Sequence, residues 1–410
     1  MSMTLTITRL NWIDSHLADF PLPRGTMTLT RSLASGLCQS PLDPPDIFWG
    51  VGDRGPNIKP ASLLKKYGVE AARELVAIDG AKIMPLPTSG PAIGQFKIEG
   101  DTITLLAAFD LTSPDGVPIG GLPVPDGPHA ESEAIFDLSG LRLATNPNGA
   151  DSEGITALPD GSFWIAEEYG PSLLRCDRAG QISMRWVPEG TGHCFAGAAY
   201  PVFETLPALA SARKLNRSFE AIAASPDGVK IYVAFQSPLA HPDRAAHETS
   251  RQARIWELDG TTGALNAEYI YPFDDPDTFW RDSSWGKVER KDIKISEIVM
   301  TPVGDLLVLE RISQSTKIYR VALTPDKIAP AALSDPATRP TLEQMSRKDI
   351  GRAQIPTLDK TLVMSTDDHQ EISPDLEGML LLSSNCLLLS NDSDFGIEGV
   401  ETVFWLVDLG

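Results

Sequence analysis

The chain has 410 residues, of which 42% are hydrophobic, and its 55 acidic residues exceed its 35 lysines and arginines to give a formal net charge of −20. This charge disfavours nucleic acid and anionic membrane surfaces as steady partners. The length would allow two or three domains, but the 33 glycines and 33 prolines suit an all-β chain with many turns. Because a closed repeat fold can use the whole chain, we expect a single domain over residues 1–410.

Both ends of the chain alternate apolar and polar residues in the manner of strands, over residues 4–12 and 400–407. In a ring of β-sheet blades, such terminal strands commonly complete one shared blade. We therefore expect the N- and C-terminal strands to close one blade of a β-propeller, which leaves no open sheet edge.

Hairpins of one design recur between these ends. The clearest is residues 151–171, where Asp160 and Gly161 form the turn between two apolar strands. The same plan is found at 35–54, 219–237, 296–311 and 376–392. A further hairpin at 95–106 would supply a sixth blade, so the sequence predicts an all-β, six-bladed propeller. Long loop insertions are expected at 188–216, 238–252, 271–292 and 324–357.

Four of the hairpins carry a leading glutamate at the same distance before the turn, namely Glu153, Glu220, Glu297 and Glu377. In a propeller the first strand of each blade lines the central channel, so these carboxylates would form a ring at one mouth. Further acids would lie just outside the ring, namely Asp53, Glu167, Glu168, Glu310 and Asp392. Clustered oxygen ligands without paired histidines or cysteines favour calcium over zinc.

A structural role is the alternative for each glutamate, with the carboxylate bonded to backbone amides or to Arg54, Lys294 or Arg311. The chain has no Gly-x-Ser-x-Gly motif, and its six histidines are scattered. Catalysis would therefore use a metal-activated water with a carboxylate as the base.

Several stretches match a known pattern in their order along the chain. They include Gly-Asp-Arg-Gly-Pro-Asn at 52–57, Asp-Ser-Glu-Gly-Ile at 151–155, Glu-Glu-Tyr-Gly-Pro at 167–171 and Asn-Asp-Ser-Asp-Phe-Gly at 391–396. Over nearly its whole length the chain resembles the phytase-like family, described by an esterase-like activity of phytase. The resemblance implies a β-propeller related to the calcium-dependent phytases, in which cations at an acidic channel mouth hold an anionic substrate. Ala221 departs from the glycine usual after the glutamate, and Ser393 from the usual asparagine.

Together, the residues and the resemblance predict a calcium-dependent hydrolase of phosphomonoesters or similar anionic esters. The expected metal ligands are Glu153, Glu220, Glu297, Glu377, Asp392 and Asp394. The expected substrate-binding residues are Asp53, Arg54, Lys294 and Arg311, and the expected catalytic carboxylates are Glu167, Glu168 and Glu310.

Two alternatives remain open at this point. One is a hydrolase of carboxylic esters or lactones that uses the same calcium site, and the other is a non-catalytic propeller that binds a ligand or partner around structural calcium. Few lysines and arginines lie near the motifs, which counts against a substrate with many phosphates. We expect a monomer whose partner is a small anionic ester. No signal peptide is evident, so a cytoplasmic location is expected, although members of the resembling families are often exported.

Overall fold

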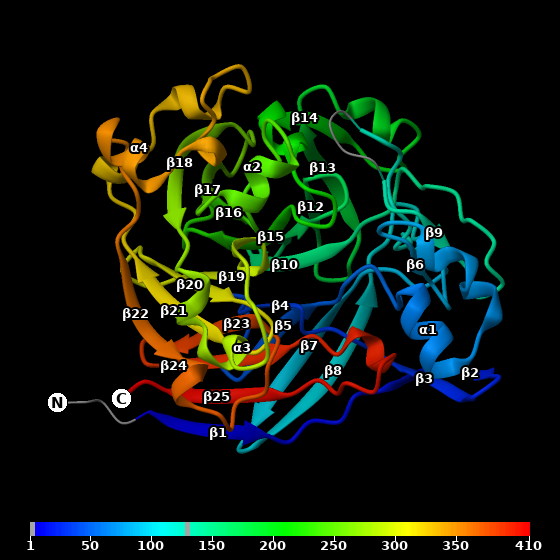
Figure 1. Ribbon diagram of the computed structural model, residues 1–410. Coiled ribbons are helices and arrows are strands. Elements are labelled where there is room, and N and C mark those ends of the chain that lie inside the picture. Colours follow the sequence, from blue (N-terminus) through cyan, green and yellow to red (C-terminus); the bar gives the residue numbers. More distant parts are fainter. Residues whose placement is uncertain (1–4, 128–131) are drawn as a thin grey trace.

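The computed structural model of the protein describes residues 5–127 and 132–410. Five sheets of four or five strands form the framework of this part of the chain (Figure 1). Sheet one contains β4 (Gly36–Cys38), β5 (Ile47–Val51), β7 (Ala92–Glu99) and β8 (Thr102–Asp110). Sheet two contains β10 (Ser152–Ala157), β11 (Phe163–Glu167), β12 (Ser172–Cys176), β13 (Ile182–Pro188) and β14 (Val202–Leu206).

The other three large sheets have four strands each. Sheet three contains β15 (Phe219–Ala224), β16 (Lys230–Phe235), β17 (Gln252–Asp259) and β18 (Leu265–Pro272). Sheet four contains β19 (Lys294–Met300), β20 (Leu306–Arg311), β21 (Thr316–Val321) and β22 (Lys360–Ser365). Sheet five contains β23 (Leu376–Ser383), β24 (Cys386–Asn391), β25 (Phe404–Asp408) and β1 (Thr6–Leu10). Strands β1 and β25 pair from Thr6 opposite Asp408 to Leu10 opposite Phe404, so the two terminal strands share one sheet as predicted.

The first strands of the five sheets lie together at the centre of the molecule. Strand β10 contacts β4 and β15, and β19 contacts β15 and β23, which in turn contacts β4. The backbones approach closely here, because a Cβ on Gly36 or Gly154 would come within 2.6 or 2.7 Å of a carbonyl oxygen on the neighbouring strand. This arrangement of antiparallel four-stranded sheets is consistent with a β-propeller.

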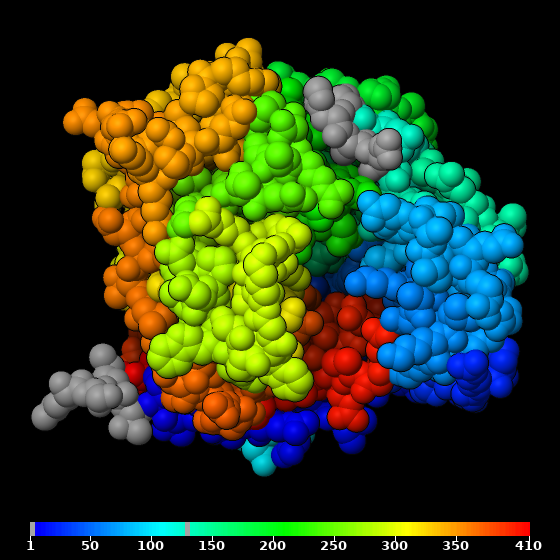
Figure 2. All heavy atoms as spheres, viewed as in Figure 1, coloured from blue at the N-terminus to red at the C-terminus, as the bar shows by residue number. Residues whose placement is uncertain are grey.

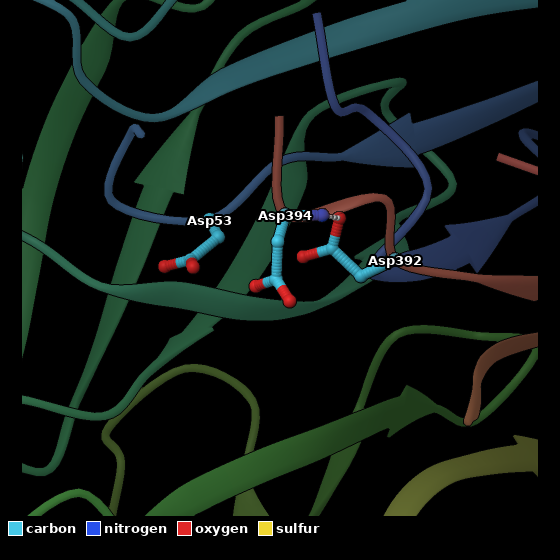
Figure 3. A group of neighbouring side chains, drawn as sticks. All are labelled: Asp53, Asp392 and Asp394. Atoms are coloured by element: carbon cyan, nitrogen blue, oxygen red, sulfur yellow. Dashed lines mark hydrogen bonds between the residues drawn. The ribbon is translucent and has the colours of Figure 1, made fainter. Parts of the chain in front are cut away.

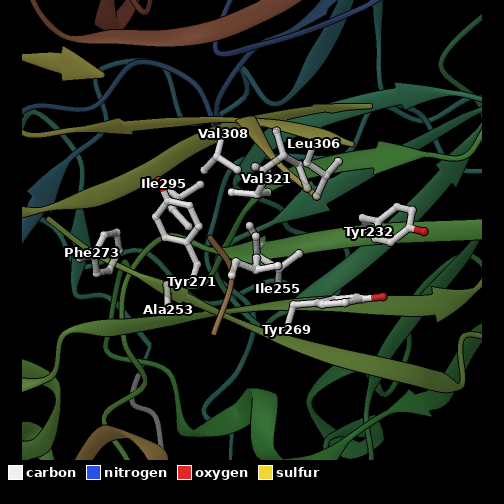
Figure 4. Close-up of a cluster of buried hydrophobic side chains, with 14 of the residues drawn as sticks. Tyr232, Ala253, Ile255, Tyr269, Tyr271, Phe273, Ile295, Leu306, Val308 and Val321 are labelled. Atoms are coloured by element: carbon white, nitrogen blue, oxygen red, sulfur yellow. The ribbon is translucent and has the colours of Figure 1, made fainter. Parts of the chain in front are cut away.

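Buried apolar clusters hold neighbouring sheets together. Figure 4 shows the cluster between sheets three and four, where Ile255 and Tyr269 face Ile295 and Val308. Similar clusters join sheets one and two, two and three, four and five, and five and one. Because neighbouring sheets cover each other in this way, strands such as β11, β16 and β20 are almost entirely buried, whereas outer strands such as β1 and β8 keep exposed residues.

The hairpin at 95–106 does not form a blade of its own. Strand β7 pairs with β5, from Ile47 opposite Lys97 to Val51 opposite Ile93, so this hairpin completes sheet one. Between β5 and β7 the chain makes an excursion that carries α1 (Pro60–Tyr67) and β6 (Lys82–Ile83). This excursion separates the two halves of sheet one along the sequence. The sequence pattern therefore predicted two blades where the structure has one sheet.

The connections between strands carry the short helices and two small sheets. The α-helices besides α1 are α2 (Arg244–Thr249), α3 (Trp280–Ser283) and α4 (Arg347–Arg352). The 3₁₀ helices are η1 (Glu70–Ala72), η2 (Glu74–Ala77), η3 (Gly192–Phe195), η4 (Ala208–Ala212), η5 (Pro276–Thr278), η6 (Arg290–Asp292), η7 (Pro325–Lys327), η8 (Ala331–Ser334), η9 (Leu342–Gln344), η10 (Thr366–Asp368) and η11 (Asp394–Gly396). The small sheets pair β2 (His16–Leu22) with β3 (Gly25–Thr30), and β6 with β9 (Ile135–Phe136).

Figure 2 shows a hollow in the surface where the segments that carry α1 (blue), α2 (green), α3 (yellow) and η11 (red) meet. Within the described residues, no helix has the length and apolar character needed to cross a membrane.

Candidate functional site

A β-bulge interrupts the first strand of four of the sheets near its beginning. The pairing shifts between Ser152 and Gly154, between Phe219 and Ala221, between Ile295 and Glu297, and between Leu376 and Gly378. A bulge leaves one residue unpaired and turns its side chain away from the regular alternation. The bulged residues are Glu153, Glu220, Ser296 and Glu377, and Ser35 precedes β4 at the corresponding position. We call these five residues the bulge ring.

Side-chain contacts link members of the bulge ring. The hydroxyl of Ser35 lies 3.4 Å from carboxylate oxygens of both Glu153 and Glu377. The hydroxyl of Ser296 lies 3.4 Å from Glu220. The bulges on four sheets, and the position of Ser35 before β4 on the fifth, therefore place these side chains at the same end of the inner strands, which we call the mouth of the channel.

Glu297 does not occupy the ring position expected for it. The turn between β19 and β20 runs over Thr301–Gly304, which is earlier in the hairpin 296–311 than the spacing of the glutamates requires. Ser296 therefore takes the ring position. Glu297 is buried, and its carboxylate accepts hydrogen bonds from the backbone amides of Leu37 (3.3 Å) and Ile298 (3.0 Å). Burial raises its pKa well above the ordinary value, although these two bonds oppose the shift. Glu297 thus links β19 of sheet four to β4 of sheet one.

A second set of polar residues stands at the ends of the second strands, which lie at the same mouth. These residues are Asp53, Glu168, Gln236, Arg311 and Asp392. Asp53 belongs to two groups of carboxylates whose oxygens lie within 4.8 Å of one another. The members of the two groups are Asp53, Asp392 and Asp394 in one, and Asp53, Asp151 and Glu153 in the other. We call these five carboxylates the acid cluster.

Figure 3 shows one of the two groups. The carboxylates of Asp53 and Asp394 lie near each other, and the backbone amide of Asp394 donates a 3.1 Å hydrogen bond to Asp392. Asp394 has a positive φ of 49°, as do two other polar residues near the mouth, Asn216 (56°) and Asp375 (59°). Such backbone conformations are costly for residues with a side chain and are often retained at functional sites.

Burial makes the acid cluster electrostatically unfavourable by itself. It raises the pKa of Asp151 well above the ordinary value, against the opposing charge of Arg54. The pKa values of Glu153 and Asp392 are raised well above the ordinary range too, first by burial and then by neighbouring carboxylates. Asp151 Oδ1 is buried and accepts no hydrogen bond from the described residues. A cation among these oxygens would satisfy them, and the oxygen-only donor set suits calcium.

Arg54 ties the acid cluster to the surrounding loops. Its guanidinium lies 2.8 Å from Asp151 and 3.4 Å from Asp53. It also donates to Asn216 at 2.6 Å and to Glu133. Because these partners engage most of its donors and it is buried, Arg54 positions the acids rather than offering a free face to a ligand.

The opposite side of the mouth is basic. Arg311 donates to Ser296 at 2.7 Å and to Asp375 and Glu377. Lys294 pairs with Arg311 in the β19–β20 register, and the charge of Arg311, followed by burial, lowers the pKa of Lys294 to about 8. Arg217 is half-buried, and its Nη1 has no hydrogen-bond partner among the described residues. The mouth is thus acidic on sheets one, two and five, whereas sheets three and four carry its basic residues together with Glu220.

Two of the three predicted catalytic carboxylates lie in separate buried networks. Glu167 pairs with Arg185 at 2.7 Å within sheet two. Glu310 bonds Lys360 of sheet four at 2.6 Å and Tyr271 of sheet three at 2.7 Å. Glu167 directly precedes Glu168, and Glu310 directly precedes Arg311, which both lie at the mouth. Because successive side chains of a strand point to opposite faces, Glu167 and Glu310 point away from it. Neither belongs to the acid cluster.

Glu168, the third of them, lies at the mouth. It is buried and accepts a 3.1 Å hydrogen bond from the backbone amide of Ser218. Burial raises its pKa, while the charges of Arg54, Arg213 and Arg217 oppose the shift. Glu168 therefore faces both the acid cluster and the basic side.

Sequence reasoning did not select several of the residues at this mouth, among them Asp151, Arg217, Gln236 and Ser296. Asp151 and Arg217 stand in the same short motifs as Glu153 and Glu220, which is the signal that would have found them. Gln236 and Ser296 are neutral, and the register that places them is apparent only from strand pairing.

Residues 34–395 match the family described as "Phytase-like: Esterase-like activity of phytase". An "Uncharacterized secreted protein" of Arthroderma benhamiae is 30% identical over 303 residues, which are 66% of this chain and 55% of the relative. The chain thus spans about half the length of the curated relative that it matches.

Similar solved structures include the PQQ-bound aldose sugar dehydrogenase of Streptomyces coelicolor, which is 11% identical, with a TM-score of 0.34 and 99% and 98% of the two chains covered. The major allergen Mala s 1 of Malassezia sympodialis is 9% identical, with a TM-score of 0.36 and coverages of 94% and 87%. Such low similarity transfers no function to this chain.

Proposed function

The chain belongs to the phytase-like family, and from this and the acid cluster we propose that it is a calcium-dependent hydrolase of phosphomonoesters or similar anionic esters. The five large sheets would be the blades of one propeller, closed where sheet five packs on sheet one. The active site would be the mouth of the channel, at the bulged ends of the first strands.

The observation that carries the proposal is the pair of carboxylate groups that share Asp53. They consist of oxygen donors alone, are largely buried, and include an oxygen of Asp151 with no described hydrogen-bond partner. Structural acids at hairpin ends would instead be satisfied by backbone amides, as Glu297 is. This contrast favours a cation site over the structural alternative.

Calcium held by the acid cluster would supply positive charge that acidifies a water and offsets the charge of a phosphoryl oxygen. The chain's own residues would do the rest. Arg217, Lys294 and Arg311 would bind the anionic group from the basic side. Glu168 would accept the proton of the attacking water as its oxygen bonds to phosphorus.

Glu220 is suited to protonate the alcohol that leaves when the phosphorus–oxygen bond breaks. Burial, together with the charges of Glu168 and Glu377, raises the pKa of Glu220 to about 8. It therefore retains its proton near neutral pH, which a general acid requires. Its Oε2 has no hydrogen-bond partner among the described residues and is thus uncommitted.

A carboxylic ester or lactone hydrolase is the nearest alternative, because the family description names an esterase-like activity. A binding propeller with structural calcium is a further alternative, supported by the way Arg54 of sheet one pairs with Asp151 of sheet two. For location, the relative named as secreted supports export as an alternative to the cytoplasmic location expected from the sequence.

The test is hydrolysis of p-nitrophenyl phosphate and p-nitrophenyl acetate by EDTA-treated protein, with and without added calcium. We expect calcium to restore turnover of the phosphate. Asp53→Asn should abolish both this turnover and the rise in melting temperature that calcium produces, because Asp53 belongs to both carboxylate groups. The control Asp101→Asn changes an exposed turn acid on sheet one and should alter neither.

Preferred turnover of the acetate would select the carboxylic ester alternative. Absence of turnover together with a calcium-raised melting temperature would select the binding propeller.

A further inference from the structure

A cavity of about 880 Å³ lies between the excursion that carries α1, the η4 loop and α2. Its lining gathers basic residues that are far apart in the sequence, namely Lys59, Lys82, Arg213, Lys214, Arg244 and Arg339. In a chain with a net charge of −20, this concentration of positive charge is local and specific. Sequence reasoning selected none of these six residues, because they lie in separate segments that share no sequence motif.

The acids of the lining do not neutralise this charge. Glu133 pairs with Arg54, and Asp243 accepts the amide of Ala246 at the start of α2. Asp79 is exposed. Of the six basic residues, Arg244 alone has a carboxylate within 4 Å in the part of the chain that the structure describes, and this carboxylate is Glu248. The cavity therefore presents several cations that hydrogen-bond at most to neutral groups and have no ion-pair partner among the described residues.

Lys214 and Lys82 show the effect of this unbalanced charge. The pKa of Lys214 is lowered first by burial and then by the charges of Arg217 and Arg244. The pKa of Lys82 is lowered first by burial and then by Arg54. An anion bound between these side chains would relieve both penalties.

Most of the remaining lining is apolar. The apolar residues are Ala208, Leu209, Ala212, Leu215, Ala240, Pro242 and Pro336, and Gly80, Asn216 and His241 complete the lining. A site for small inorganic anions alone would not need such a surface, whereas an organic body could bury apolar area against it.

Arg54 connects the acid cluster with residues that line the cavity. It contacts Asp53 and Asp151 on the cluster side, and it bonds Asn216 and Glu133, which line the cavity. A molecule that reaches past Arg54 can place one anionic group at the cluster and its remaining part in the cavity.

We propose that the cavity holds the leaving part of the substrate, and that this part is a bulky organic anion with negative charge beyond the ester that is cleaved. The inference deepens the proposed hydrolase function and rests on it. It places the choice of substrate in the α1, η4 and α2 segments rather than in the blades.

The first test measures binding alone. Pyranine, a pyrene that carries three sulfonates, is titrated with EDTA-treated protein and followed by fluorescence anisotropy, so neither calcium nor turnover is involved. We expect the wild type to bind it, and Lys214→Gln and Arg339→Gln each to weaken binding by about tenfold through loss of one charged contact. Lys348→Gln, an exposed change on α4 outside the cavity, is the matched control and should bind as the wild type.

The second test compares turnover of pyranine phosphate with that of 4-methylumbelliferyl phosphate, whose leaving group carries no additional charge. We expect the wild type to prefer pyranine phosphate through a lower KM. In Lys214→Gln, kcat/KM for pyranine phosphate divided by kcat/KM for 4-methylumbelliferyl phosphate should fall by about tenfold. The fall should come from a higher KM for pyranine phosphate.

The outcomes separate the two proposals. A wild type that does not bind pyranine, or a folded Lys214→Gln variant that binds it as tightly, would overturn the cavity inference. Displacement of pyranine by an equal concentration of tripolyphosphate would overturn the organic part of it. Pyranine binding without turnover of either phosphate would overturn the hydrolase function and leave the cavity as a binding site for an organic anion.

Discussion

The two ends of the first strands of the sheets differ in backbone register, in polarity and in charge. Where the strands begin, bulges direct Glu153, Glu220 and Glu377 toward the acid cluster and the basic side. Where they end, tight turns close the hairpins and a cavity of about 520 Å³ is lined mainly by apolar residues, with Asp43 its only carboxylate among the described residues. The same strands thus carry a polar, charged end and a mainly apolar one.

The difference teaches how one scaffold separates stability from function. Between the two ends the register is regular and side chains pack into the clusters that join the sheets. At the mouth the register is broken, polar atoms are buried, and positive φ angles occur at Asp375 and Asp394. Substitutions should therefore affect unfolding in the packed region and turnover at the mouth.

The largest effect on stability is expected in the packed region. Trp164 is fully buried in sheet two, with its ring 4.1 Å from that of Trp186. Trp164→Ala should lower the free energy of unfolding by about 3–5 kcal/mol, because it removes the buried ring and leaves a cavity. Urea unfolding followed by fluorescence would measure this, and a loss below about 1 kcal/mol would contradict the packing described.

The largest effect on turnover is expected from Glu153→Gln at the bulged end of β10. It should lower calcium-dependent turnover by about 100-fold, or about 2.7 kcal/mol of transition-state stabilisation, while the melting temperature stays level or rises because a buried charge is removed. Thr156→Ser near the other end of the same strand keeps the hydroxyl that accepts from Ala224 and is the matched control. Equal rates for the two variants would show that the two ends do not differ in function.

The pH dependence of stability should reveal the strain at the mouth. Glu220 and Glu377 have pKa values of about 8 and about 7 in the folded protein, against an ordinary value of 4.5. At pH values between the ordinary pKa and the raised pKa values, the folded state holds more protons than the unfolded state. The free energy of unfolding should therefore fall as the pH rises from about 5 to 8.

Melting temperatures in EDTA at pH 5, 6.5 and 8 would test this expectation. Calcium should reduce the fall because it favours the ionised carboxylates, and Glu220→Gln should reduce it in EDTA as well. A melting temperature in EDTA that is constant or rises over this range would contradict the raised pKa values.

The smallest effect is expected from Glu297→Gln. This residue lies within the channel, and the amide would lose one of the two backbone hydrogen bonds that the carboxylate accepts. The cost should be about 1 kcal/mol of stability. Calcium affinity, measured by titration calorimetry, should be unchanged. If Glu297→Gln lost as much calcium affinity as Glu153→Gln, Glu297 would be a metal ligand, as the sequence predicted.

Local patterns were sufficient for part of the fold and part of the site. The hairpin at 151–171 was found from its Asp-Gly turn and its apolar alternation, and the terminal strands from alternation alone. The short motifs contain most of the acid cluster, because chelating residues lie close together in the loops that end the strands.

Local sequence patterns did not predict features that depend on a partner far away in the sequence. Nothing in residues 95–106 shows that β7 pairs with β5 across the α1 excursion. Glu167 and Glu168 are adjacent acids, yet only Glu167 meets Arg185 from β13. The same applies to Glu310 and Lys360 of β22.

The sequence alone determined that this protein is an all-β chain of repeated hairpins with acids at one end of each, because turn chemistry and strand alternation act over a few residues. Tertiary structure alone decided which acids share a site, which are paired as salt bridges, and that Lys82, Lys214 and Arg339 line one cavity. These outcomes depend on bulges, register and distances between segments far apart in the chain, and electrostatic interactions follow distance in space rather than separation in sequence.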